Sequence, residues 1–310
     1  MKTSPVTFED LSASVIAVPP LARNADLEVN VAENAKLIRH LEAGGVKTLM
    51  YGGNANFYNI RVSEVAKTIE ALAGAASADT WIIPSAGADF GKMMDEAPIY
   101  RSLGVPTVMV LPQSGLTTPS GVADGIRRFS DAFGKQVIVY IKAEGYLEPE
   151  DVAALVSEAR VCAIKYAIVR NDPAEDAYLG KLVNLVDRRY IISGIGELPA
   201  VAHFREFGLS SFTSGSVCVA PALSMAMLRA LRAGDWSRAL AIREQFLPLE
   251  TLRNRINPIR VLHDAVSLAG IADMGPILPL LSNLDPADRP AVQAAAKALL
   301  GLNATAREAA

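Results

Sequence analysis

The chain of 310 residues contains only two cysteines and three histidines. Cys162 and Cys218 both lie in apolar segments, which indicates buried, reduced thiols rather than a disulfide framework. The histidines fall in predicted helices, at spacings that suit no metal site. Neither a Walker-type loop nor a Gly-x-Ser-x-Gly elbow occurs. The sequence therefore predicts chemistry that needs no metal and no dissociable cofactor.

Long apolar runs and a concentrated basic surface are missing as well. Charged residues, glycine or proline interrupt every apolar stretch before it could span a membrane, and residues 1–5 lack the apolar core of a signal peptide. The formal net charge is −3 and the basic residues are dispersed, which disfavours binding to nucleic acid. The small group Arg253, Arg255 and Arg260 is interpreted as a solvated helix end. We expect a cytoplasmic protein that binds neither membranes nor nucleic acid.

What the chain does have is an alternation of short β-branched runs with longer amphipathic stretches. Eight strands, each followed by a helix, are the number required for an α/β fold of the (β/α)₈ TIM-barrel type. A doubly wound open sheet is less well supported, because no Gly-x-Gly-x-x-Gly turn follows the first strand. The predicted strands cover residues 14–18, 48–51, 81–84, 107–111, 136–141, 162–167, 190–193 and 211–214.

After the eighth strand the pattern becomes wholly helical. Helices are predicted over 222–233, 236–250, 258–268 and 287–300, with Gly234-Asp235, Asn257-Pro258 and Asp285-Pro286 between them. We therefore expect a barrel over residues 1–233 and a C-terminal helical extension, packed on the barrel, over 234–302. Residues 303–310 read as a frayed tail.

Lys165 lies within an apolar run, residues 161–169, where an ammonium group is costly to bury. At the C-terminal end of a barrel strand, a lysine with a pKa lowered by desolvation could attack a ketone to form a Schiff base. The alternative is a lysine that extends its ammonium group to water. Tyr140 stands 25 positions earlier, on the preceding strand, where its phenol could relay protons or simply fill the barrel.

Small residues occupy the loops after other strands. Gly53 and Asn54 could hold a carboxylate with free backbone N–H groups, or form an ordinary turn. Ser193 and Gly194 follow the seventh strand and leave room for a substrate. Because loops after strands seven and eight often bind anions in barrels, a phosphorylated ligand near Gly194 and Gly215 is a further possibility.

These residues together resemble the dihydrodipicolinate synthase / N-acetylneuraminate lyase superfamily. The likeness extends from about residue 14 to residue 300, including the helical tail, and the segment from Tyr51 to Ile60 is most similar to that of 5-dehydro-4-deoxyglucarate dehydratases. The motifs that carry it are Gly52-Gly53 with Phe57-Tyr58, Val139-Tyr140, Ile164-Lys165, Ser193-Gly194 and Asn257-Pro258.

The resemblance implies a class I lyase, an aldolase or dehydratase, acting on a small 2-oxo acid or 2-oxo-3-deoxy sugar acid. Lys165 would form the Schiff base, Tyr140 would shuttle protons, and the backbone around Gly53 and Asn54 would bind the carboxylate. It also implies a homo-oligomer, either a tetramer or a dimer.

The sequence departs from the family at several positions. Gly53-Asn54 replaces the usual threonines, and Gln113-Ser114 replaces the tyrosine pair of the lysine-pathway synthases, so dihydrodipicolinate synthesis is not expected. One interpretation is a different substrate, with Gln113 and Ser114 lining a divergent pocket beside Lys142 and Glu144. The other is a non-catalytic 2-oxo-acid-binding barrel.

Overall fold

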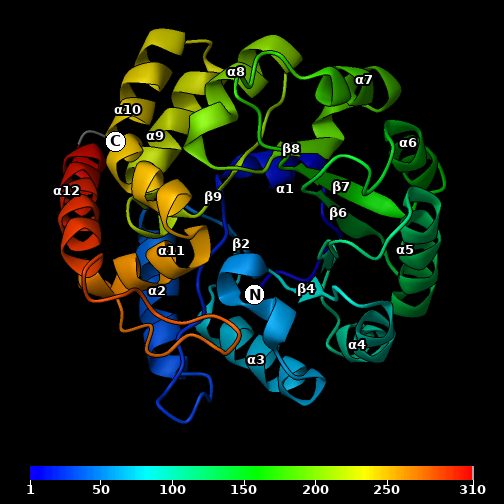
Figure 1. Ribbon diagram of the computed structural model, residues 1–310, viewed down its shortest axis with the longest axis horizontal. Helices are drawn as coiled ribbons and strands as arrows, with labels where there is room; N and C mark the ends of the chain where they lie inside the picture. Colours follow the sequence, from blue (N-terminus) through cyan, green and yellow to red (C-terminus); the bar gives the residue numbers. More distant parts are fainter. Residues whose placement is uncertain (309–310) are drawn as a thin grey trace.

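Short parallel strands form a closed barrel at the centre of the molecule, and helices surround it (Figure 1). The computed structural model describes residues 1–308. Within that range the strands are β1 (Ile16–Ala17), β2 (Thr48–Met50), β3 (Trp81–Ile83), β4 (Ser85–Ala86), β5 (Met109–Val110), β6 (Val137–Ile141), β7 (Val161–Tyr166), β8 (Ile191–Ser193) and β9 (Thr213–Ser214).

The strands close the barrel by parallel pairing alone. β1 pairs with β2 and β9, β2 pairs with β3, and β4 to β8 pair in chain order. A bridge between Ser193 and Phe212 joins β8 to the segment that leads into β9. Only Pro84 separates β3 from β4. Because proline has no N–H group to donate to a neighbouring strand, β3 and β4 together form one interrupted strand of the barrel. The barrel therefore has eight strand positions, as the alternation of β-branched runs and amphipathic stretches in the sequence predicts.

Helices cover the outside of this barrel. α5 shows how the sequence builds them: Thr118 accepts a hydrogen bond from the Gly121 N–H, Pro119 begins the helix, and Gly134 ends it at φ 80°. The helices are α1 (Phe8–Ala13), α2 (Val31–Ala43), α3 (Val62–Ala75), α4 (Phe90–Ser102), α5 (Pro119–Phe133), α6 (Pro149–Ser157), α7 (Ala177–Leu185), α8 (Glu197–Phe207) and α9 (Pro221–Arg232). Single 3₁₀ turns are η1 (Gly53–Ala55), η2 (Phe57–Asn59), η3 (Arg188–Tyr190) and η4 (Ser216–Cys218).

The C-terminal extension consists of α10 (Trp236–Arg255), α11 (Pro258–Leu268) and α12 (Arg289–Glu308). α10 and α12 both contact α9, and α10 also contacts α8, so the extension lies against one side of the helical ring (Figure 1). The prediction of a frayed tail from residue 303 is wrong for residues 303–308, because α12 continues to Glu308 and the side chain of Asn303 is buried. Residues 309 and 310 lie outside the described residues.

The barrel interior determines where a polar side chain can reach solvent. Strand residues are buried throughout β1 to β9, and the only one that is half-buried is Tyr140. This pattern follows from a parallel sheet covered by helices on the outside and filled by side chains on the inside. Chemistry is therefore confined to the ends of the strands and the loops that follow them.

Candidate active site

Lys165 stands near the C-terminal end of β7, directly opposite Tyr140 of β6 in the parallel register. Its side chain is buried, with 5% of the residue exposed. The Nζ atom lies 4.3 Å from the centre of the Tyr140 ring, a cation–π distance. The spacing of 25 residues between the two positions thus brings amine and phenol together on neighbouring strands.

The surroundings of Lys165 favour its neutral amine. Burial is the main cause that lowers the pKa of Lys165 from 10.5 to about 7, and the positive charges of Lys142 and Arg253 contribute to the same shift. A lysine in water is almost wholly protonated at neutral pH, whereas this one is partly a free amine, the form that attacks a ketone.

Tyr140 is protonated in the same surroundings. Burial raises the pKa of its phenol well above the ordinary value, and the neighbouring Tyr58 raises it further. Tyr58 donates a hydrogen bond to the Pro112 carbonyl at 3.4 Å, which is long for a hydroxyl donor. At neutral pH Tyr140 therefore offers a proton to a group bound beside Lys165.

A cavity of about 220 Å³ opens above these two residues, and most of the predicted site residues line it. Gly53 and Asn54 come from η1, after β2, and Gly194 comes from the loop after β8. The full lining is Val18, Gly53, Asn54, Tyr58, Tyr140, Lys142, Lys165, Ala167, Val169, Gly194, Ile195, Gly196, Thr213, Gly215, Glu250, Arg253, Asn254, Pro258 and Ile259.

The backbone of η1, which lines this cavity, has two N–H groups without a backbone acceptor. Within residues 1–308, the N–H groups of Gly53 and Asn54 donate to no backbone carbonyl, whereas those of Ala55 and Asn56 bond to Gly52 and Gly53. The side chain of Asn54 donates to the Val18 carbonyl at 2.8 Å, so it ties η1 to the loop after β1. The two free amides are suited to a carboxylate.

Gly194 is required for this arrangement. Its N–H donates to the Tyr166 carbonyl at 2.6 Å, which holds the loop after β8 against the end of β7. A Cβ atom at this position would lie 2.9 Å from Cγ of Lys165. A side chain here would therefore displace the lysine.

Ser193, by contrast, lies outside the cavity, contrary to the prediction. Its side chain is fully buried, and Oγ is 2.8 Å from Nδ1 of His203 on α8. Because a strand's side chains alternate, Ser193 points away from the barrel mouth while Gly194 borders it. Ser193 therefore fastens β8 to α8 and does not meet a ligand in this cavity.

Gln113 and Ser114 line a second cavity of about 720 Å³, which the loop after β5 shares with residues 142–146. Tyr58 and Lys142 line both this cavity and that of Lys165, so the two adjoin. Gln113 is held by a hydrogen bond of 3.0 Å from its Nε2 to Asp89. Only a ligand that extends past Tyr58 and Lys142 would meet Gln113 and Ser114.

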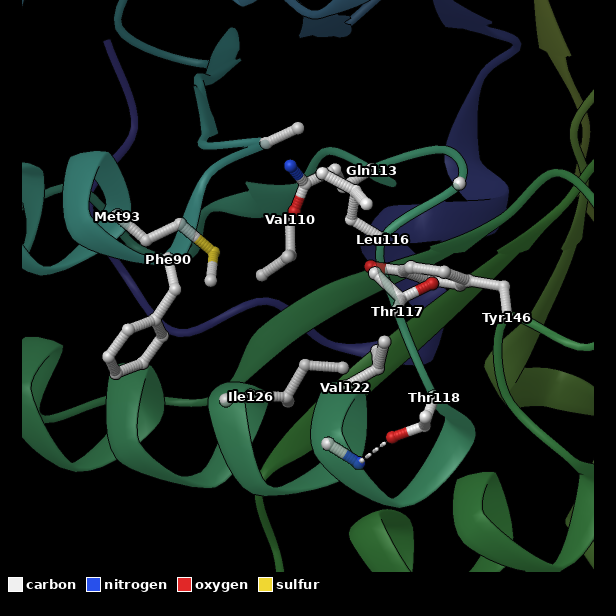
Figure 2. A pocket seen from close by; sticks show the side chains of 14 residues that line it. Phe90, Met93, Val110, Gln113, Leu116, Thr117, Thr118, Val122, Ile126 and Tyr146 are labelled. Carbon is white, nitrogen blue, oxygen red and sulfur yellow. Dashed lines mark hydrogen bonds between the residues drawn. The ribbon is translucent and has the colours of Figure 1, made fainter.

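A third cavity of about 620 Å³ continues under the same loop, between α4 and α5. Figure 2 shows Phe90 and Met93 of α4 on one side of it and Val122 and Ile126 of α5 on another. It is mainly apolar and contains no pair of groups suited to acid–base or nucleophilic chemistry. It is therefore not the reactive centre.

Arg253 is the residue that the sequence interpretation placed wrongly. It is 7% exposed, not part of a solvated helix end, and its Nη1 donates to Oε1 of Glu250 at 2.5 Å. Both residues belong to α10 and both line the Lys165 cavity. Arg255, two positions later, is exposed as expected. The i, i+3 spacing of Glu250 and Arg253 on one helix was the available signal for their pairing.

Residues 1–308 contain neither a metal site of clustered side chains nor a membrane-spanning helix. No group of three or more histidine, cysteine, aspartate or glutamate side chains is placed to hold a metal ion. No helix there has both the length and the apolar character that crossing a bilayer would need.

The family model of the dihydrodipicolinate synthetase family matches residues 12–299 of the sequence. The chain belongs to this family. The resemblance inferred from the motifs is thereby confirmed. A probable 5-dehydro-4-deoxyglucarate dehydratase of Rhizobium meliloti (strain 1021) is 25% identical over 289 residues, which are 91% of this chain and 94% of that protein.

Solved structures share the fold of the dihydrodipicolinate synthetase family with this chain. The dihydrodipicolinate synthase of Oceanobacillus iheyensis superimposes with a TM-score of 0.83 at 21% identity, covering 94% of this chain and 97% of that one. A sialic acid aldolase of Ruminococcus gnavus gives 0.82 at 15% identity, covering 96% and 99%. As a dihydrodipicolinate synthetase family member, the protein is a lyase of the class that acts on small 2-oxo acids through a Schiff base.

Proposed function

We propose that Lys165 is the Schiff-base lysine of this lyase and that Tyr140 is its proton relay. The observation that carries the proposal is the buried amine of Lys165, with its pKa lowered to about 7, held 4.3 Å from the Tyr140 ring at the floor of a cavity. A buried lysine without a carboxylate partner is costly, and the cost is explained if the free amine is needed.

The roles follow from the positions. The free N–H groups of Gly53 and Asn54 bind the substrate carboxylate, which directs the adjacent ketone to Lys165. The amine adds to the carbonyl carbon, Tyr140 protonates the carbinolamine oxygen, and water leaves to give the imine. For loss of water, the C3–H bond breaks and its electron pair passes to the protonated imine, which becomes an enamine. The enamine electrons then return to form the C3–C4 double bond while the C4 hydroxyl group leaves, and this hydroxyl and the proton from C3 together make one water molecule. Hydrolysis of the imine returns the amine and frees the product.

The substrate that we propose is a 2-oxo-3-deoxy sugar acid, and the reaction that we propose is loss of water. The support is the relative named a probable 5-dehydro-4-deoxyglucarate dehydratase, which aligns with 91% of this chain. Carbon–carbon cleavage would proceed from the same imine, so the assay must follow both release of pyruvate and loss of water.

One experiment tests the residue assignment. The protein is reduced with borohydride in the presence of pyruvate or of a 2-oxo-3-deoxy sugar acid, and its intact mass is measured. We expect one adduct per chain, located by peptide mapping at Lys165 and not at Lys142, the other lysine that lines the cavity. Lys165→Ala should abolish the adduct, and Lys181→Ala, at an exposed position on α7, should retain it. An adduct that survives Lys165→Ala contradicts the assignment.

A non-catalytic 2-oxo-acid-binding barrel is the alternative that this experiment also tests. Such a protein would show a thermal shift with 2-oxo acids, no borohydride adduct and no turnover. The pairing of an amine with a phenol disfavours it, because binding alone requires neither a nucleophile nor a proton relay.

Assembly and location complete the proposal. We expect a homo-oligomer, a tetramer or a dimer, and light scattering after gel filtration would measure its mass. A cytoplasmic location stays a prediction from the sequence.

A further inference from the structure

Glu250 and Arg253 form a buried ion pair that opens onto the Lys165 cavity. They are 2% and 7% exposed, and Arg253 Nη1 donates to Glu250 Oε1 at 2.5 Å. Ser216 donates a hydrogen bond to the same carboxylate oxygen. Glu250 is therefore fixed by two donors, and it in turn fixes the plane of the guanidinium group.

One nitrogen of that guanidinium group, Nη2, has no hydrogen-bond partner within residues 1–308. Nε, by contrast, lies 3.4 Å from the Pro258 carbonyl. A Cβ atom on Gly215 would lie only 2.8 Å from Nη2, so the absence of a side chain there makes room for the guanidinium group at the cavity wall. An arginine that served packing alone would be expected to use this nitrogen as well.

The charges that line the cavity are unbalanced. Among the lining residues, Lys142 and Arg253 contribute two cations, the protonated imine on Lys165 contributes a third once substrate is bound, and Glu250 contributes one carboxylate. A 2-oxo monoacid would bring a single negative charge, which the amides of Gly53 and Asn54 already receive. The imbalance leaves a place for a second anionic group at Arg253, on a different wall of the cavity from η1.

We propose that Arg253, oriented by Glu250, is the residue that binds a second carboxylate of the substrate and so selects 2-oxo diacids over 2-oxo monoacids. Glu250, whose Oε2 accepts no hydrogen bond within residues 1–308, accepts one from the adjacent substrate hydroxyl. This inference rests on the proposed function, since it assumes that the 2-oxo end of the substrate lies at Lys165. It assigns specificity to α10 of the C-terminal extension, which lies beside α9 and α11 in Figure 1.

The test compares two ligands that differ only in the second carboxylate, 2-oxoadipate and 2-oxohexanoate. Half-saturating concentrations are measured by borohydride trapping and, without borohydride, dissociation constants are measured by calorimetry. We expect the diacid to bind about 30-fold more tightly, as for a charge-assisted arginine–carboxylate pair. Arg253→Gln should reduce this ratio to about 3-fold or less.

The ratio is the deciding quantity, because loss of the Arg253 charge acts on Lys165 in the same way whichever acid is bound. Arg255→Gln, at an exposed position on the same helix, is the matched control and should leave the ratio unchanged. If Arg253→Gln does not fold, the double variant Glu250→Gln/Arg253→Gln, which leaves no unpaired buried charge, should show the same reduced ratio.

The outcomes separate this inference from the proposed function. Equal binding of both acids by the unchanged protein, or a ratio that Arg253→Gln leaves intact, overturns the role of Arg253 while adducts at Lys165 still support the Schiff base. Absence of any adduct, together with an Arg253-dependent preference in calorimetry, overturns the Schiff base and leaves the diacid site supported.

Discussion

Lys165 Nζ lies 4.3 Å from the centre of the Tyr140 ring, and the two residues are direct partners across β6 and β7. The face of an aromatic ring attracts a cation, so this contact by itself would favour the protonated lysine. Burial and two nearby positive charges act in the opposite direction and prevail, because the pKa of Lys165 falls to about 7. The ring therefore positions the amine, and its surroundings make it nucleophilic.

The first prediction concerns the pH dependence of imine formation. Only the neutral amine attacks a ketone, so the rate of borohydride-trapped adduct formation with pyruvate should rise about tenfold per pH unit below pH 7 and level off above it. An ordinary lysine, with a pKa near 10.5, would give a rate that still rises at pH 9. That second profile would show that the lysine is not desolvated in solution.

The second prediction concerns stability. Unfolding restores the ordinary pKa of Lys165, so between pH 7 and about 10.5 the unfolded chain binds more protons than the folded protein. The free energy of unfolding therefore rises with pH across this window, and the cost of Lys165 is greatest below pH 7. Lys165→Met should stabilise the fold by about 2–4 kcal/mol at pH 6 and by much less at pH 10.

Denaturant titrations at the two pH values would measure this difference. The control is Lys47→Met, at an exposed position just before β2, which should change stability by no more than about 0.5 kcal/mol. Destabilisation by Lys165→Met at both pH values would contradict the expected cost of burial.

The third prediction separates the ring of Tyr140 from its hydroxyl. Tyr140→Phe keeps the aromatic face beside Lys165 and removes the proton donor, so kcat should fall by about 10²–10³-fold while a borohydride adduct still forms. Tyr178→Phe is a suitable control. Its hydroxyl donates to the Leu147 carbonyl at 2.6 Å, outside the cavity, so the change should lower Tm and leave kcat unaltered. A kcat unaffected by Tyr140→Phe would assign the relay elsewhere.

The central pair of the site was predictable from the sequence because local patterns determine it. Each apolar run forms one barrel strand, and one helix connects each strand to the next. Tyr140 and Lys165 are therefore direct partners in the pairing of neighbouring strands. The loop at Gly53 and Asn54 was predictable for a similar reason, since paired glycines after a strand leave backbone N–H groups free.

Arg253 and Ser193 were not predictable in the same way, because long-range packing decides their roles. The sequence neighbours of Arg253 are mostly charged and amide residues, so the local pattern predicts a solvent-exposed side chain. Only the packing of α10 against the loop after β9 buries it. Ser193 is the last residue of β8, where a barrel strand often supplies a ligand-binding residue, but its side chain faces α8 and its Oγ forms a hydrogen bond with Nδ1 of His203. A shift of one position along a strand reverses the face that a side chain occupies.

The fourth prediction concerns Gly194. A Cβ atom there would lie 2.6 Å from the Tyr166 carbonyl oxygen and 2.9 Å from Cγ of Lys165, so Gly194→Ala must move the lysine or the loop. We expect a loss of about 1–3 kcal/mol in stability and of at least about 10²-fold in kcat/KM. In contrast, Gly74→Ala, at an exposed helical position of α3 with open space around it, should stabilise by about 0.5–1 kcal/mol. Wild-type kcat/KM in Gly194→Ala would show that the loop is not tightly held.

The last prediction concerns the end of α12, which the sequence suggested was frayed. Asn303 Oδ1 accepts hydrogen bonds from the N–H groups of Ala222 and Leu223 at 2.7 and 3.3 Å, so it serves as the N-terminal cap of α9 from a distant part of the chain. α9 offers no side chain of its own for this purpose, because Ala220 precedes it and Pro221 begins it. Asn303→Ala should cost about 1–2 kcal/mol, measured by thermal or denaturant unfolding. Asn303→Asp keeps the acceptor and adds a negative charge beside a helix N-terminus, so it should retain most of the stability. Equal loss in both variants would mean that Asn303 acts through packing rather than through these two hydrogen bonds.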